Sequence, residues 1–194
     1  MNQNTNIRLL AENKPDFPIK TERLLIASIR SEDTEEISKQ NTADGLNTYL
    51  LSLTKEEIEK ALSNVDEVQS VLDRMNDIKR APIYETYGAW YEGKLIGFAS
   101  FLVCQYGTME IQIEVLPEYQ HKGFGFELLS NVLRTLFAHN HSICFRYTVI
   151  PNNKASIAVA EKLGAQLQAP QSAAEKMLLR TYLIRDFEKA SAIE

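Results

Sequence analysis

The sequence predicts an α/β (α+β) domain in which one mixed, mostly antiparallel sheet of six to seven strands is flanked by helices. Three observations support this: helical periodicity follows a first strand, a run of apolar strands fills the middle, and strands alternate with helices afterwards. The expected order is β-α-α-β-β-β-α-β-α-β-β. We expect a lead-in over residues 1–20, a single domain over 21–187 and a tail over 188–194.

The first half of the chain begins with one strand and two helices. Residues 24–29 are apolar and strand-like. Ser31 and Thr54 each begin a polar stretch with acids in the first turn, which is a helix-start pattern. These patterns predict helices over about 31–41 and 54–79. The apolar residues that recur at helical spacing in the second are Ile58, Ala61, Leu62, Val65, Val68, Val71, Leu72 and Met75.

The pattern changes after Pro82 to an antiparallel meander. Its strands are expected over 84–91, 95–104 and 109–116, with breaks at the E-G-K turn and at Gly107. The elements expected after the meander are a helix at about 125–139, a strand over 143–150, a helix over 153–163, and strands over 165–168 and 177–185.

Composition limits the classes of function. Hydrophobic residues make up 44% and charged residues 24%, as in soluble globular proteins, and the net charge of -5 argues against a general nucleic-acid binder. No stretch of eighteen apolar residues predicts a membrane span, and residues 1–14 do not resemble a secretory signal, so we expect a cytoplasmic protein. Cys104 and Cys144 lie in apolar strands and are expected to be buried thiols. No metal-ligand spacing is present, so no metal is expected.

The most informative segment is V-L-P-E-Y-Q-H-K-G-F-G-F, residues 115–126, between a strand and a helix. Gly123 and Gly125 allow a tight turn and close approach to a ligand. Consecutive N–H groups and the start of the helix would then form a phosphate site beside Lys122. The alternative is a glycine turn that caps the helix. Leu128 stands where a dinucleotide fingerprint needs glycine, and no Walker G-K-[ST] follows.

With this loop the sequence resembles the Gcn5-related N-acetyltransferases, whose pyrophosphate loop reads Q/R-x-x-G-x-G/A after the fourth strand. Gln120, Gly123 and Gly125 occupy that pattern. Further stretches resemble the branch that includes ribosomal-protein alanine acetyltransferases, and the similarity covers about residues 21–185. These stretches are T-E-R-L at 21–24, P-E-Y-Q at 117–120, N-K-A-S-I at 153–157 and E-K-L-G at 161–164. The resemblance implies the fold of that family and acetyl transfer from acetyl-CoA to a primary amine in a ternary complex.

The resemblance also implies how coenzyme A binds. In the family the fourth and fifth strands splay apart and the pantetheine arm enters between them, where free backbone groups need partners. The main chain of Val115 would bond the arm on one side and Asn153 on the other, although asparagine is also a good N-cap for the helix that follows. The implied coenzyme A-binding residues are Val115, Gln120, His121, Lys122, Gly123, Phe124, Gly125, Phe126, Asn153 and Ser156.

Acetyl transfer needs a base for the amine, stabilisation of an oxyanion and a proton for the departing thiolate. Ser156 matches the serine that is thought to protonate the thiolate in the resembling branch, and a plain first-turn helix serine is the alternative reading. Many other members use a tyrosine four residues further on, where this chain has Ala160. His121 is expected near phosphate rather than as a base.

The candidate bases lie on the strand 109–116. Alternation places Glu110, Gln112 and Glu114 on one face, which is explained by a substrate cleft or by partial solvation. Glu110 matches a glutamate common in the branch, and Glu175 is a distant third candidate. Arg146 stands where the branch often has glutamate, which leaves the acceptor open. The aromatics expected mainly in the core are Tyr84, Tyr87, Trp90 and Tyr91, with Tyr87 or Tyr91 as alternative cleft residues.

Two further functional classes stay open. A chain of this fold can bind acetyl-CoA as a non-catalytic sensor, or it can bind a partner protein; a nucleic-acid module is disfavoured by charge. The acceptor candidates are a protein N-terminus, a lysine, a polyamine, an aminoglycoside-like amine or an amino acid, and the branch resemblance favours the N-terminus. We expect a monomer or a homodimer, with no nucleic-acid or membrane partner.

Overall fold

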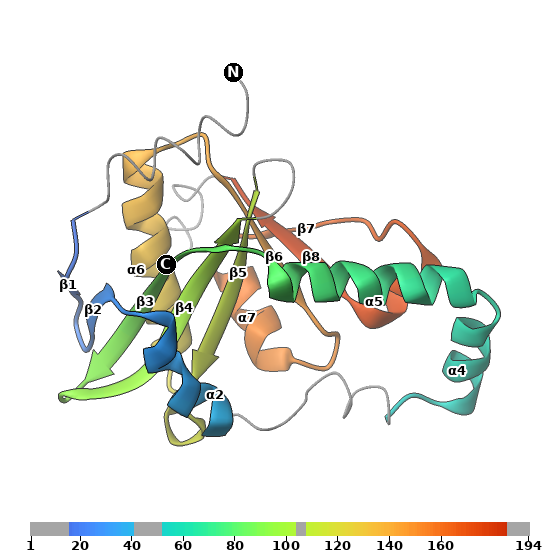
Figure 1. The fold of residues 1–194 in the computed structure, drawn as a ribbon, viewed down its shortest axis with the longest axis horizontal. Coiled ribbons are helices and arrows are strands. Elements are labelled where there is room, and N and C mark those ends of the chain that lie inside the picture. Colours follow the sequence, from blue (N-terminus) through green and yellow to red (C-terminus); the bar gives the residue numbers. More distant parts are fainter. Residues whose placement is uncertain (1–15, 41–51, 104–107, 186–194) are drawn as a thin grey trace.

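The computed structural model describes residues 16–40, 52–103 and 108–185 (Figure 1). An eight-stranded sheet runs through the molecule in the order β1-β2-β3-β4-β5-β6-β8-β7. Neighbouring strands are antiparallel except β5 and β6, which are parallel. The mixed, mostly antiparallel sheet that the sequence predicts is therefore confirmed, with eight strands in place of six or seven.

The order of the strands and helices along the chain is close to the expected order. The strands are β1 (Ile19–Lys20), β2 (Leu25–Ser28), β3 (Ile83–Tyr91), β4 (Lys94–Val103), β5 (Thr108–Val115), β6 (Cys144–Val149), β7 (Gln166–Leu167) and β8 (Arg180–Ile184). The helices are α2 (Glu35–Gln40), α4 (Lys55–Leu62), α5 (Val65–Arg80), α6 (Phe124–His139), α7 (Lys154–Lys162) and α8 (Ala173–Leu178), with 3₁₀ turns η1 (Ser31–Thr34) and η3 (Pro117–Tyr119).

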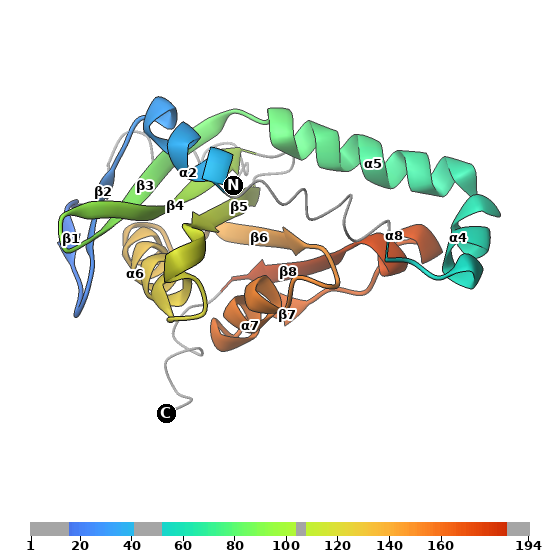
Figure 2. The same cartoon turned by 90° about the horizontal axis from the view of Figure 1, so that it is seen from below.

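Helices cover both faces of the sheet, as expected. Figure 2 shows α6 and α7 on one face and α2 and α5 on the other, with α4 and α8 at the end of the molecule beyond β6 and β8. The main core lies under α6, whose buried face repeats at helical spacing. Its fully buried residues include Leu128, Leu129, Val132, Leu133 and Leu136. On the opposite face, Ile37 of α2 packs with Phe98 and Leu116.

The prediction of one continuous helix over 54–79 is wrong, because the structure has two helices there, α4 and α5. Thr54 starts the first as predicted: its hydroxyl accepts from the N–H of Glu57 at 3.3 Å, and the Glu57 carboxylate accepts from the N–H of Thr54 at 2.8 Å. Asn64 then starts the second, since its Oδ1 accepts from the N–H of Glu67 at 3.4 Å. An asparagine that bonds the backbone in this way favours a new helix start over continuation.

Two other segments depart from expectation. Residues 173–178 form α8, so the last expected strand begins only at Arg180; Ser172 caps this helix by accepting from the N–H of Glu175 at 3.0 Å. β1 adds a short strand against β2. Cys104 and Gly107 lie outside the described residues. Among the helices that the structure describes, none is both long and apolar enough to cross a bilayer.

Candidate functional site for coenzyme A and acetyl transfer

The two central strands separate partway along their length. β5 and β6 pair from Thr108 with Cys144 to Glu110 with Arg146, and their pairing ends there. β5 nevertheless continues to Val115 and stays paired with β4 along that stretch. Beyond Glu110, the edge of β5 is therefore not paired with β6. Its backbone N–H and C=O groups are available to bond a ligand. This is the strand separation that the resemblance implies.

Gly97 of β4 is needed at the end of this separation. It lies opposite Val115. A Cβ atom at this position would lie 2.6 Å from the carbonyl oxygen of Glu114 and 3.2 Å from the Cα of Val115, so only glycine allows the two strands to approach this closely. The sequence analysis included Gly97 in an apolar run and missed its role. A lone glycine inside a strand was the signal that could have found it.

The cofactor loop, residues 120–126, joins η3 to α6. The side-chain amide of Gln120 donates to the carbonyl of Val115 at 2.8 Å, which fastens the loop to the end of β5. Gly123 has a φ of +83° and is the N-cap of α6, and no side chain caps this helix. The first intrahelical bond runs from the N–H of Glu127 to the carbonyl of Gly123 at 3.0 Å. A helix start without a side-chain cap presents backbone N–H donors and a positive dipole end, which suit a phosphate.

The other loop residues divide into anchors and exposed positions. Phe124 is buried, and its ring packs on Tyr91 with centroids 4.9 Å apart. Phe126 is half-buried under the ammonium group of Lys162, which lies 4.2 Å from the ring centroid. These ring contacts hold the loop against the rest of the domain. The exposed residues are His121, with a φ of 58°, and Lys122.

Asn153 lies just before α7, and Ser156 lies in the first turn of that helix. The Asn153 Oδ1 accepts from the N–H of Ser156 at 3.0 Å, which is the N-cap geometry. Burial raises the pKa of Tyr147 to about 12, and a side-chain hydrogen bond with Ser156 opposes the rise. The sequence analysis missed Tyr147. Its alternation with Phe145 and Val149 along β6 indicated only that it is buried.

Glu110 lies at the point where the strands separate and is buried. Arg146 donates from Nε to its Oε2 at 2.5 Å, and the N–H of Thr148 donates to its Oε1 at 2.8 Å. Burial raises the pKa of Glu110, and the positive charge of Arg146 opposes that rise. Arg146, a departure from the family pattern, is thus the ion-pair partner of the glutamate that matches it.

The other two candidate bases, Glu114 and Glu175, lie in different parts of the fold. Glu114 is half-buried on the α2 side of β5 and accepts from the hydroxyl of Ser38 at 3.3 Å. Glu175 is buried in α8; the N–H of Gln171 donates to it at 2.8 Å. Its ion pair with Arg74 brings their atoms to 2.9 Å without hydrogen-bond alignment. The carboxylate of Glu175 therefore links α8 to α5.

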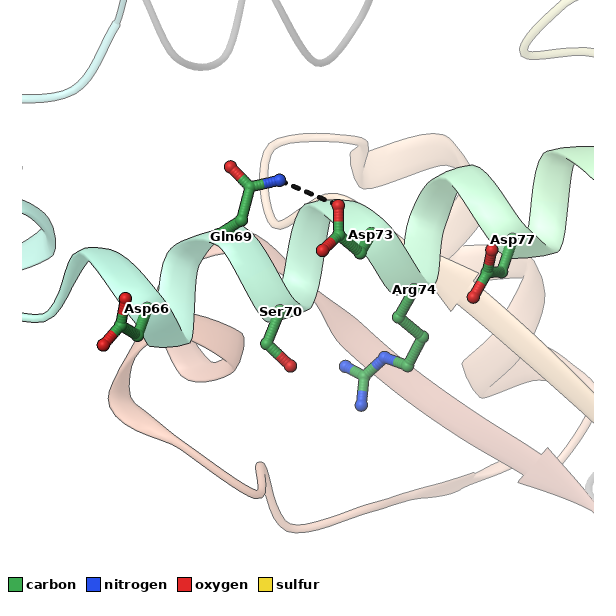
Figure 3. A pocket seen from close by; sticks show the side chains of 6 residues that line it. All are labelled: Asp66, Gln69, Ser70, Asp73, Arg74 and Asp77. Carbon is green, nitrogen blue, oxygen red and sulfur yellow. Dashed lines mark hydrogen bonds between the residues drawn. The ribbon is translucent and has the colours of Figure 1, made fainter.

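Two cavities lie along α5. One of about 450 Å³ is open along the helix, and Figure 3 shows its polar lining of Asp66, Gln69, Ser70, Asp73, Arg74 and Asp77. In it Gln69 donates to Asp73 at 2.8 Å. The other, about 210 Å³, is lined by Glu67, Ser70, Val71, Arg74, Gln171, Ser172 and Glu175. Neither cavity is lined by a residue of the cofactor loop. Within the described part of the chain, no group of three or more His, Cys, Asp or Glu could hold a metal.

Comparison with known proteins decides the family. The family model for acetyltransferases of the GNAT family matches residues 51–165, more than half of the chain. The protein belongs to the GNAT family. The expected fold class is that of this family, and the chain is accordingly an acetyltransferase.

Relatives of this GNAT protein agree with the assignment. It is 28% identical over 155 residues to the uncharacterized N-acetyltransferase YoaA of Bacillus subtilis (strain 168), covering 77% of this chain and 84% of that one. Its fold is similar to the ribosomal-protein alanine acetyltransferase of Vibrio fischeri (TM-score 0.54, 17% identity, 88% of this chain and 98% of that one). It is also similar to a ribosomal α-N-protein acetyltransferase in complex with coenzyme A (TM-score 0.58, 14% identity, 88% and 98%).

Proposed function

We propose that the protein binds acetyl-CoA across the cofactor loop and the exposed edge of β5, and transfers the acetyl group to a primary amine. The observation that carries this proposal is the start of α6, where Gly123 in the left-handed region leaves the helix without a side-chain cap beside the separating strands. The N–H groups of Gly123 to Phe126 hold the pyrophosphate, with Lys122 adding positive charge. The pantetheine arm runs along β5 towards Ser156.

In the proposed reaction the amine attacks the thioester carbonyl directly in a ternary complex. A tetrahedral intermediate forms, and a base takes the proton that the amine loses. The carbon–sulfur bond then breaks, and the hydroxyl of Ser156 gives its proton to the thiolate and regains one from solvent. Burial keeps the nearby hydroxyl of Tyr147 neutral, since it raises the pKa of that group to about 12. The two candidate bases on β5 are Glu110, whose two oxygens accept hydrogen bonds from β6, and Glu114, which accepts a hydrogen bond from Ser38 of α2.

The acceptor that we propose is a protein N-terminus. The support is the fold shared with two acetyltransferases of ribosomal proteins, together with a polar β5 face that lies towards α2. An internal lysine or a small amine is the competing acceptor.

A second candidate function is binding of acetyl-CoA without transfer. The Glu110–Arg146 ion pair favours it, because it ties the family-matched carboxylate to a positive charge. A thiol-release assay separates the two functions. Acetyl-CoA is supplied with free N-terminal peptides, the same peptides with blocked N-termini and an internal lysine, and small amines. Release with free N-termini supports the proposal, release only with the other acceptors rejects the N-terminal assignment, and acetyl-CoA binding without release from any acceptor supports the sensor.

A further inference from the structure

The T-E-R-L segment between β1 and β2 contacts the cofactor loop directly. Arg23 Nη1 donates to the carbonyl of Lys122 at 2.9 Å. Its Nε donates to Glu127 Oε2 at 2.7 Å, and its Nη2 lies 2.6 Å from the same oxygen. The guanidinium carbon also lies 4.3 Å from the ring centroid of Phe124. One side chain therefore touches the loop, the first helical residue and the first turn of α6.

Glu127 is held from a second direction as well. The hydroxyl of Thr21 donates to its Oε1 at 2.5 Å, and the backbone N–H of Arg23 donates to the same oxygen at 3.1 Å. Its side chain is 13% exposed. Burial raises the pKa of Glu127, but the hydrogen bonds from Thr21 and Arg23 outweigh that effect and leave it below its ordinary value. The carboxylate is thus charged and fixed at both oxygens.

These contacts bracket Gly123, the residue with the left-handed backbone. Arg23 bonds the residue just before it and the carboxylate four residues after it, so the planar guanidinium spans the turn. A Cβ atom on Gly123 would lie only 3.4 Å from Arg23 Nη2. A rigid guanidinium fork with fixed partners at both ends restricts the backbone between them.

We propose that Arg23 and Glu127, assisted by Thr21, form a loop clamp that holds the cofactor loop in its phosphate-binding conformation. The inference rests on the proposed binding of coenzyme A at this loop. Within the clamp the positive charge of Arg23 is matched by Glu127, so Arg23 acts as a positioning residue and not as a phosphate ligand. Its effect is on coenzyme A affinity, because a loop that is already ordered does not lose conformational freedom on binding.

The test is isothermal titration of coenzyme A into the full chain. Glu127→Gln and Arg23→Lys each disrupt the clamp with little change of size, and we expect each to weaken affinity about tenfold, the effect of losing a charge-assisted hydrogen bond. The loss should appear in KM for acetyl-CoA rather than in kcat. Glu118→Gln is the matched control: it removes one carboxylate next to the same loop, one that pairs with Lys94 on β4, and should change affinity less than twofold.

The other outcomes overturn the clamp. If Arg23 binds phosphate directly, Glu127→Gln tightens coenzyme A binding, because it releases a positive charge. If the contacts only stabilise the fold, both variants melt at lower temperature with unchanged affinity. If Glu127→Gln does not fold, Thr21→Val, which removes one hydroxyl donor to the same carboxylate, is expected to weaken affinity in the same direction, and an unchanged affinity rejects the clamp. If the wild-type chain binds no coenzyme A, the proposed function itself is refuted. If Gly123→Val loses coenzyme A binding while the clamp variants keep full affinity, the clamp alone is refuted.

Discussion

Gly123 combines a backbone requirement and a proposed ligand contact at one residue. Its φ of +83° lies in the left-handed region, which costs a residue with a Cβ roughly 1–2 kcal/mol, and a branched side chain would also crowd the helix start. We therefore predict that Gly123→Val loses measurable coenzyme A binding while its far-UV circular dichroism stays close to native. Titration calorimetry on the folded variant is the measurement.

Gly125 supplies the matched control for that change. A Cβ atom there would meet Ile113 and Val115 at 3.6 Å, an ordinary van der Waals distance, so no strain is expected. Gly125→Ala should keep coenzyme A affinity within a few-fold. Equal affinity in Gly123→Val and wild type would contradict the loop as the phosphate site.

A substitution of the single residue Ser156 tests catalysis separately from cofactor binding. Coenzyme A thiolate leaves without help, so the loss of a proton donor slows the reaction, and general acid catalysis contributes about 10²–10⁴-fold. We predict that Ser156→Ala keeps acetyl-CoA affinity within a few-fold and lowers kcat at least about tenfold. The measurements are kcat at saturating acetyl-CoA and a direct Kd. An unchanged kcat would leave Ser156 as an ordinary first-turn helix residue, and a weaker Kd with normal kcat would assign it to the pantetheine arm.

At the scale of elements, Glu127 joins the segment before β2 to α6, and this link is pH-dependent. The folded pKa of Glu127 lies below its ordinary value of 4.5, so the folded state binds the proton less readily than the unfolded chain. Its contribution to stability is present above pH 4.5 and is lost as the pH falls through the lowered pKa. We predict that wild type melts above Glu127→Gln at neutral pH and that the gap narrows below pH 4.5. Melting curves of both proteins from pH 7 downward test this, and a constant gap would refute the linkage.

Elements with a strong local pattern were predictable, and those with a weak pattern were not. α6 combines a glycine start with a long buried stripe, and its expected bounds differ from the observed ones by a single residue at the start. α8 and β1 are short, and their few residues carry no resolved period. The α4–α5 boundary depended on one asparagine within an otherwise continuous apolar repeat. Short elements depend on neighbours in space, which local propensity does not describe.

At the scale of the whole molecule, binding of acetyl-CoA should stabilise the fold. A ligand that binds only the native state adds RT ln(1 + [L]/Kd), about 2.7 kcal/mol at a hundredfold excess over Kd. For a domain of this size that corresponds to a rise in Tm of roughly 5–10 °C. Thermal scans with and without acetyl-CoA measure it, and Gly123→Val should show no rise. A wild-type Tm that acetyl-CoA does not change would refute the cofactor assignment.

The sequence by itself was enough to predict the family and the fold class, both of which are confirmed, and to propose where the cofactor loop lies. Each of these depends on residues that are close together in the chain: the Gln120 to Gly125 pattern, helical spacing under α6, and strand alternation on β5. Periods and turn chemistry are local properties, so they can be read without knowing which segments meet.

Only the tertiary structure decided which side chains meet around that loop. Arg23 reaches a loop 99 residues away and a carboxylate 104 residues away, and Glu110 binds an arginine 36 residues further on. The same structure places Glu175 with Arg74, outside the strand that carries the other candidate bases. No local period encodes these pairs, because they exist only once folding has brought distant segments of the chain together. Their burial and mutual hydrogen bonds then determine which charged groups are fixed in place and which are left for chemistry.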